Sequence, residues 1–358
     1  MDFKRSNQNN FDFVNDIRFW SMFAIVLEHC ALLIFPTDHY NSLSILLVAL
    51  IVQLCKFGTI ALFIISGFLL GRMSINDKWG YFSRRVQAIG TPWVIWVSLQ
   101  CLIGLSYIFF IKHEKIKVLL YIGKSIFFSA YWFVLIYFFT LMIFLLLITF
   151  INRIYLLFIG CSLLYAINLY TNWFITNHTL AFFGYISYVF IGYKIYENYA
   201  NVCKLLDKVP IGIIFIFVLF TYCLSIGEGY LLYYKLFSDD WLNTLRFSNQ
   251  IYSILVFTFL LKLKNSWYPK SLNPRKNTFG VYLVHPILLI SISFLYKTVI
   301  SKIFMIDRHT ISNIVLYETS IPVKISYLVV VFINVYGGSY FVIWCLKRLR
   351  LGFVVANT

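Results

Sequence analysis

The first apolar segment of this chain begins with the run DIRFWSMFAIVLEH at residues 16–29. This run places Arg18, Glu28 and His29 in a stretch that is otherwise apolar enough to enter a membrane. A helix rises about 1.5 Å per residue, so Arg18 and His29 would lie about 16 Å apart along it. Ionisable groups in a membrane segment are costly, and each one is therefore a candidate for a functional site, the alternative for His29 being a buried histidine satisfied by a neighbouring helix. Because histidine takes and gives a proton near neutral pH, His29 is the strongest candidate for chemistry.

The whole chain has the composition of an integral membrane protein. Of its 358 residues, 61% are hydrophobic and 12% are charged, and the mean hydropathy is +0.80. Soluble domains carry about 25% charged residues, roughly twice as many. The first apolar segment is too long for a cleaved signal peptide, and no small-residue cleavage site follows it. We therefore expect this segment to remain in the protein as its first membrane span.

Windows of about 20 apolar residues predict about ten transmembrane helices, and so an all-α polytopic membrane helix bundle. The linkers between them are short, which predicts a single domain over residues 1–358. Lys56 interrupts the second window, where we expect a break or a tilt. The predicted spans are residues 17–35, 44–71, 88–111, 130–151, 154–171, 179–196, 210–228, 247–263, 278–296 and 325–346.

The formal net charge of +16 is explained by membrane topology. Nineteen lysines and arginines fall on the side of the N-terminus and ten on the other side, which predicts that both termini are cytoplasmic. The stretch 112–124 is an exception, because it puts four lysines on the outer side. The expected partner is therefore the lipid bilayer and not nucleic acid. The seven cysteines form no C-x-x-C pair and are expected to be buried, with no metal site.

Two further motifs lie close to the predicted cytoplasmic face. KWGYFSRR, residues 78–85, is expected to be a basic loop whose Arg84 and Arg85 either bind phosphate oxygens or only set the topology. Pro92 then starts or kinks the third span. FIISGF, residues 63–68, contains a Ser-Gly pair that favours close helix packing over a nucleophilic role for Ser66.

Two more motifs stand at the fourth and ninth spans. YWF, residues 131–133, is by composition alone an aromatic belt at the membrane surface. FGVYLVHP, residues 279–286, places His285 inside a span and a proline directly after it. His285 then either stabilises a kink or lines a cavity, and the pattern favours neither.

The order and spacing of these motifs resemble the acyltransferase-3 family of integral membrane acyltransferases. The resemblance covers nearly the whole chain and rests on the ten residues between Arg18 and His29 and on the motifs at residues 63–68, 83–85, 131–133 and 279–286. The chain departs from the family pattern in two places. It lacks the glycine that often follows the arginine, and Glu28 stands where an aspartate is common.

The resemblance implies an O-acyltransferase of the bacterial cytoplasmic membrane. Such an enzyme moves an acetyl or other short acyl group from cytoplasmic acyl-coenzyme A to a hydroxyl of a cell-surface or lipid-linked glycan. His29 would act as a general base or as a transient acyl carrier, with Glu28 or another group orienting its ring and Arg18 stabilising the thioester or phosphates. The alternative is a non-enzymatic transporter or flippase of glycans or lipids. The implied donor-binding residues are Arg72, Arg84 and Arg85, and the implied substrate-binding residues are Trp132, Tyr282 and His285.

Overall fold

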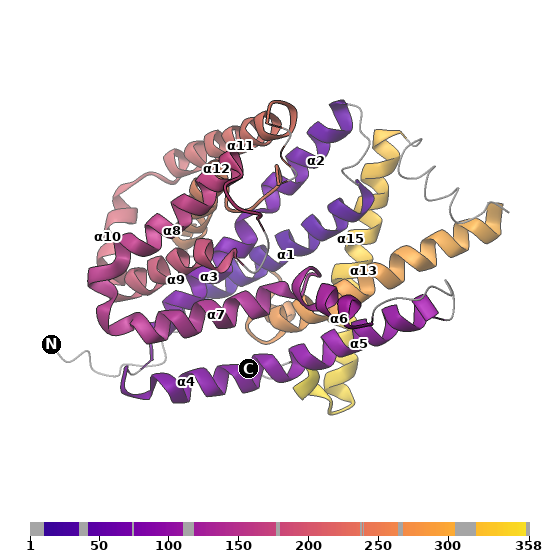
Figure 1. Cartoon of the computed structure of the whole chain (residues 1–358), viewed down its shortest axis with the longest axis horizontal. Coiled ribbons are helices and arrows are strands. Elements are labelled where there is room, and N and C mark those ends of the chain that lie inside the picture. Colours follow the sequence, from indigo (N-terminus) through magenta and orange to yellow (C-terminus); the bar gives the residue numbers. More distant parts are fainter. Residues whose placement is uncertain are drawn as a thin grey trace.

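The computed structural model describes residues 11–35, 42–73, 75–109, 118–176, 180–236, 238, 240–263, 268–304 and 320–355. These residues form helices joined by short connections (Figure 1). The main helices are α1 (Asp12–Ile34), α2 (Ser42–Cys55), α3 (Phe57–Leu70), α4 (Lys78–Arg85), α5 (Thr91–Tyr107), α6 (Val118–Phe127), α7 (Trp132–Leu147), α8 (Ile151–Thr171), α9 (Phe182–Glu197), α10 (Tyr199–Lys208), α11 (Ile211–Tyr234), α12 (Phe247–Leu263), α13 (Pro274–Phe304) and α15 (Ile321–Arg348).

The predicted polytopic helix bundle is confirmed. Eight helical segments among the described residues are long and apolar enough to cross a membrane. Every predicted span coincides with a helix, but two of the ten correspond to the shorter helices α9 and α12, with 16 and 17 residues. The cytoplasmic location of both termini stays a prediction. Of the lysine-rich stretch 112–124, residues 112–117 lie outside the described residues, and the rest belongs to the short apolar helix α6.

Two local predictions about the spans had different outcomes. The break near Lys56 is confirmed, because α2 ends at Cys55 and α3 begins at Phe57. The predicted basic loop at residues 78–85 is wrong, because these residues form helix α4. A π-helical turn, η2 (Val86–Gly90), joins α4 to α5, and Pro92 lies in the first turn of α5. A proline is tolerated at the start of a helix, so the third span extends as one helical segment over Lys78–Tyr107.

Helix α1 lies at the centre of the bundle. It packs against α2, α3, α12, α13 and α15, and Figure 1 shows it between the group of α3, α9 and α12 and the pair of α13 and α15. Its apolar side chains belong to two separate hydrophobic clusters, with Ile17 in one and Val26 in the other. The helix that carries Arg18 and His29 is therefore held on several sides.

Helices α3 and α9 cross with almost no space between their backbones. A Cβ atom added to Gly67 would collide with the backbone of Val189, and one added to Gly192 would collide with the backbone of Ile64. The predicted packing role of the Ser-Gly pair is thereby confirmed, since small residues let membrane helices approach closely. Ser66 donates its hydroxyl to the carbonyl of Leu62 at 2.8 Å.

The substitution Gly192→Ala is expected to destabilise the protein by about 1–3 kcal/mol, because the added methyl group forces α9 away from α3. Thermal unfolding of the detergent-solubilised protein measures this loss as a lower midpoint. Gly212→Ala is the matched control, because a Cβ at Gly212 would meet open space. Equal effects of the two substitutions would contradict the close crossing.

Candidate functional site

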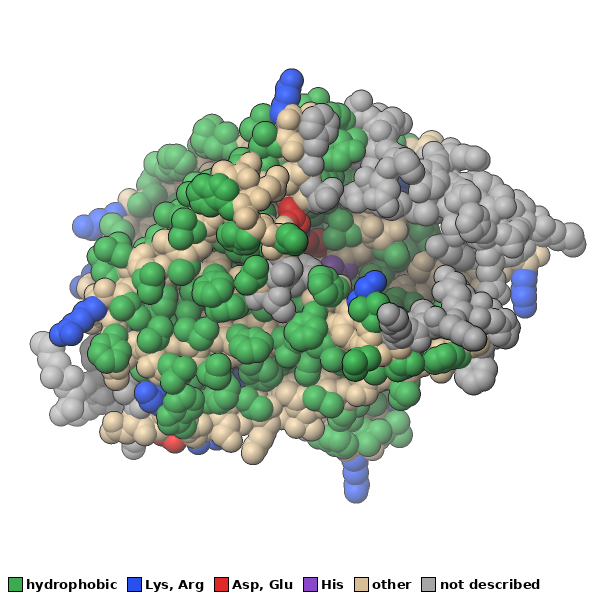
Figure 2. Space-filling model, viewed as in Figure 1, with side chains coloured by type: hydrophobic (Ala, Val, Ile, Leu, Met, Phe, Trp, Pro, Cys, Tyr) green, Lys and Arg blue, Asp and Glu red, His purple; other side chains and the backbone are tan. Residues whose placement is uncertain are grey.

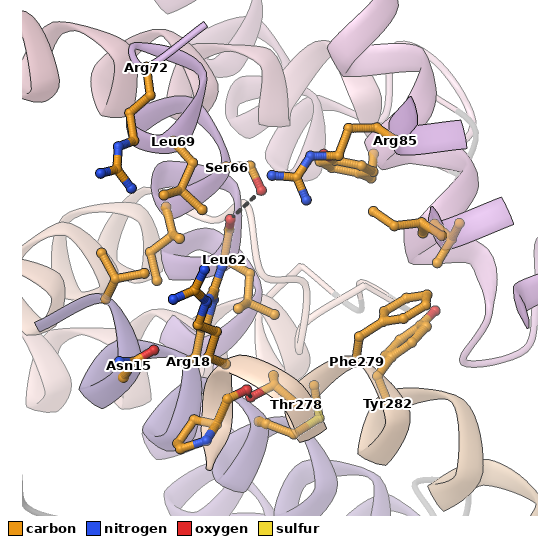
Figure 3. Close-up of a pocket in the computed structure, with 18 of the residues that line it drawn as sticks. Asn15, Arg18, Leu62, Ser66, Leu69, Arg72, Arg85, Thr278, Phe279 and Tyr282 are labelled. Carbon is orange, nitrogen blue, oxygen red and sulfur yellow. Dashed lines mark hydrogen bonds between the residues drawn. The ribbon is translucent and has the colours of Figure 1, made fainter. Parts of the chain in front are cut away.

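A cavity of about 570 Å³ lies between α1, the end of α3, α4, α7 and the start of α13. Figure 3 shows Arg18 and Arg85 projecting into it from α1 and α4. Polar groups such as Ser66 and Thr278 and the aromatic rings of Phe279 and Tyr282 complete its walls. We refer to this space as the arginine cavity, after the five arginines that line it, Arg18, Arg72, Arg84, Arg85 and Arg275.

The arginine cavity carries excess positive charge. Asp77 is the one carboxylate among the described residues that line it, and it accepts from Arg84 at 2.6 Å. This pair is exposed, with side-chain exposures of 66% and 56%. Arg85 is half-buried and donates through Nε to the hydroxyl of Tyr81 at 3.0 Å. Such a set of guanidinium groups is suited to a ligand with several phosphate oxygens.

Several arginines of the cavity come from segments distant in sequence. The positive charges of Arg85 and Arg275 lie close enough to repel the positive charge of Arg18. The guanidinium of Arg72 lies 5.3 Å from the ring centroid of Phe11. Like charges repel, and a bound anion relieves that repulsion. Nothing in the sequence around Arg275 indicated that it would join Arg18.

His29 and His285 meet where α1 and α13 pack together. The Nδ1 of His29 lies 2.8 Å from the Nε2 of His285, which is a hydrogen-bond distance. His285 is fully buried, whereas His29 is half-buried. The sequence offered a kink or a cavity-lining role for His285, and the structure instead places it in contact with His29.

Glu28 faces away from this histidine pair toward another partner. Its carboxylate accepts from Lys56 at 2.5 Å, and both side chains are almost fully buried. Lys56 is the residue between α2 and α3, and its ammonium group reaches Glu28 on α1. The geometry therefore assigns Glu28 to a buried ion pair and gives the role of ring partner to His285.

The substitution Lys56→Met is expected to destabilise the protein by about 3–5 kcal/mol, because it leaves the Glu28 carboxylate buried without its counter-ion. The double variant Glu28→Gln with Lys56→Met is expected to recover most of this loss. Thermal unfolding in detergent compares the three proteins. A double variant less stable than Lys56→Met alone would show that the two side chains do not act as a pair.

A second cavity of about 220 Å³ lies beside His29 and is also lined by Gln100, Ser129, Pro286 and Leu289. Along α1 and α13 the arginine cavity reaches as far as Met22 and Tyr282, and the second cavity begins at His29 and Pro286. The histidine pair therefore lies beyond the inner end of the arginine cavity and beside the second cavity.

The second cavity has a polar atom without a partner and an opening to the surface. The side-chain oxygen of Gln100 is buried and makes no hydrogen bond within the described part of the chain. Figure 2 shows a hollow in the face of the molecule that is turned to the viewer, with a histidine side chain visible inside it. His29 and His285 are the histidines that the structure describes. Gln100 is a polar residue in an apolar span, a signal that sequence reasoning passed over.

The remaining predicted site residues lie in different places. Tyr282 lines the arginine cavity and donates its hydroxyl to the carbonyl of Ala130 at 2.6 Å. Trp132 begins α7 and lines neither cavity itself, although it packs against Tyr185 and against Phe133, which lines the arginine cavity. Within the described ranges, no group of three or more His, Cys, Asp or Glu side chains is placed to hold a metal ion.

The fold and these cavities define a multi-pass membrane protein with a cavity lined by arginines and a pair of histidines in contact deeper in the bundle. A family model described as Acyltransferase domain matches residues 11–346. Because the match covers nearly the whole chain, the protein belongs to the acyltransferase-3 family and is a membrane acyltransferase. This membership favours an enzyme over the alternative of a transporter. No curated protein and no solved structure matches the chain in the other two comparisons.

Proposed function

We propose that this enzyme transfers an acetyl or other short acyl group from cytoplasmic acyl-coenzyme A to a hydroxyl of a cell-surface or lipid-linked glycan, in the bacterial cytoplasmic membrane. The observation that carries the proposal is the arrangement of the five-arginine cavity and the histidine pair at successive levels of α1 and α13. It supports a donor and an acceptor that approach His29 from opposite directions.

The arginine cavity supports a donor with several phosphates. Its volume of about 570 Å³ lies within the roughly 300–1,000 Å³ of pockets that enclose small organic ligands. Arg18 and Arg85 would hold phosphate oxygens, and the aromatic walls at Phe279 and Tyr282 would contact less polar parts of the donor. Acyl-coenzyme A combines these features with a thioester on a long flexible arm.

The arm would have to reach His29 past the inner end of the arginine cavity. Met22 lines that end and lies seven residues before His29, about 10 Å along α1. A methionine side chain adapts its shape more readily than other apolar residues. We therefore place the path of the thioester arm along α1, beside Met22.

His29 would then act as general base for the transfer. Its ring removes the proton of the acceptor hydroxyl as the hydroxyl oxygen attacks the thioester carbonyl carbon. The carbon–sulfur bond breaks, the new ester forms, and His29 returns the proton to the leaving sulfur. In the alternative sequence of steps, the ring nitrogen of His29 attacks the thioester carbonyl carbon, and the carbon–sulfur bond breaks to release the thiolate of coenzyme A. The acceptor hydroxyl oxygen then attacks the acyl group on the ring, the carbon–nitrogen bond breaks, and the hydroxyl proton ends on the coenzyme A sulfur.

The second cavity supports an acceptor that is small where it meets the enzyme. A volume of about 220 Å³ is below the usual range for drug-sized ligands and fits one sugar ring at the end of a chain. The unpartnered oxygen of Gln100 would accept from a sugar hydroxyl. The neighbouring apolar side chains of Leu289 and Ile290 suit the less polar face of a sugar ring.

Mass spectrometry of surface polysaccharide and lipid-linked glycans, from cells with and without the protein, tests the proposal. We expect an acyl mass increment on a glycan only when the protein is present, and its loss in a His29→Gln variant made at the same level. The purified protein in lipid nanodiscs should also release free coenzyme A from acetyl-coenzyme A when acceptor is added. Glycans of identical mass in all strains, with no coenzyme A released, would overturn the proposed reaction.

A further inference from the structure

We propose that His285 is a positioning residue that holds His29 in one tautomer, with the proton on Nδ1 and the lone pair on Nε2. This inference rests on the proposed function for its kinetic consequence, but its structural content concerns the two rings alone. It gives His285 a role in the reaction without contact with either substrate.

The two rings are arranged for a hydrogen bond in the ring planes. Their planes differ by 14° and their centroids are 5.1 Å apart, while the facing nitrogens of His29 and His285 are 2.8 Å apart. This centroid separation is close to the longest that two imidazoles can have at such a nitrogen contact. The contacting nitrogens therefore lie between the centroids, where the lone pair of one ring meets the N–H of the other.

The backbone decides which nitrogen of His285 carries the proton. Its Nδ1 lies 3.1 Å from the carbonyl oxygen of Val281. A carbonyl oxygen only accepts hydrogen bonds, so the Nδ1 of His285 must be the donor. In the neutral ring its Nε2 then carries the lone pair and accepts from His29.

The tautomer of His29 follows from that of His285. Its Nδ1 donates to the Nε2 of His285, so in the neutral ring the other nitrogen, Nε2, carries the lone pair. Nε2 is thus the atom that can remove a proton or attack a thioester. When it is protonated, Nδ1 still donates to His285, so the same hydrogen bond is kept before and after proton transfer.

Hydrogen bonds from the start of α7 hold the turn of α13 that carries His285. The hydroxyl of Tyr131 donates to the carbonyl of Leu283 at 2.7 Å, and the hydroxyl of Tyr282 donates to the carbonyl of Ala130 at 2.6 Å. Tyr131 is completely buried. These two bonds cross between the helices in opposite directions and restrain the turn on both sides, so His285 presents its Nε2 to His29 in a defined position.

A pair of amide substitutions separates positioning from simple space filling. Asparagine at position 285 places an N–H near the Nδ1 position, where it keeps the bond to Val281 but does not reach His29. Glutamine extends its carbonyl oxygen toward the Nε2 position and can accept from His29. We expect His285→Asn to lower kcat roughly 10- to 100-fold, the size of effect seen when a group that orients a metal-bound histidine is removed. We expect the KM for acyl-coenzyme A to stay unchanged and His285→Gln to restore most of kcat.

Nitrogen NMR of the full-length protein in nanodiscs, with ¹⁵N-labelled histidine, provides a test that does not depend on activity. The wild type should show the His29 ring protonated at Nδ1, assigned by the loss of its signals in His29→Gln. His285→Asn should show a mixture of tautomers. A wild-type ring protonated at Nε2, or a His285→Asn variant as active as the wild type, would overturn the inference. A wild type that transfers no acyl group, yet shows the expected tautomer, would contradict only the proposed function.

Discussion

Replacing His29 with glutamine is expected to lower the rate of acyl transfer by roughly 10²- to 10⁴-fold, the usual contribution of a general acid–base group. Binding of acyl-coenzyme A should not change, because the arginine cavity ends at Met22 and does not include His29. Release of coenzyme A in nanodiscs measures the rate, and equilibrium binding of radiolabelled donor measures the affinity.

The same variant distinguishes the two ways in which His29 could take part. Under the acyl-carrier route, acetyl-coenzyme A without acceptor should label the wild type covalently, and His29→Gln should take up no label. Under the general-base route neither protein is labelled. A stably folded His29→Gln protein that transfers acyl groups at the wild-type rate would show that His29 has no chemical role.

The second large effect is expected at the arginine cavity. Arg85→Gln should weaken the binding of acyl-coenzyme A roughly 10- to 100-fold, because a hydrogen bond to a charged group contributes about 1.5–3 kcal/mol. Arg84→Gln should have a smaller effect, since Arg84 is exposed and already paired with Asp77. Equilibrium binding of coenzyme A to the purified protein measures both affinities.

Arg153→Gln is the control for loss of one positive charge, because Arg153 is exposed on α8 and lies outside the residues that line the arginine cavity. We expect the affinity of this variant for coenzyme A to equal that of the wild type. A loss of affinity as large in Arg84→Gln as in Arg85→Gln would mean that the two arginines act only through their charge and not through position.

Apolar length and polar interruptions predicted the helices of this protein well. Each predicted span coincides with a helix, and the break at Lys56 is where the sequence indicated it. These features depend on about 20 consecutive residues at most, so the composition of each segment is enough to predict them. The prediction failed at residues 78–85, where polar and basic residues suggested a loop. Their amphipathic pattern instead continues the helix that leads into α5.

The sequence singled out several residues of the candidate site but not their contacts. The sequence singled out His29, Glu28 and His285 as costly residues inside apolar spans, and all three are buried or half-buried. It did not indicate that Glu28 pairs with Lys56 or that Gln100 lies beside His29. Such contacts depend on the rotation and depth of each helix relative to its neighbours, which the composition of a single helix does not determine.

By itself, the sequence determined that this chain is a multi-pass helical membrane protein with a few ionisable residues in its spans. The hydrophobic effect acts on each segment as a whole, so this conclusion needs no knowledge of neighbouring helices. Only the tertiary structure decided that His29 meets His285, 256 positions away in the chain, and that arginines from α1, α4, α13 and the segment just after α3 share one cavity. Close packing of α1 against α3 and α13 brings these groups together, because it fixes which face of each helix points inward.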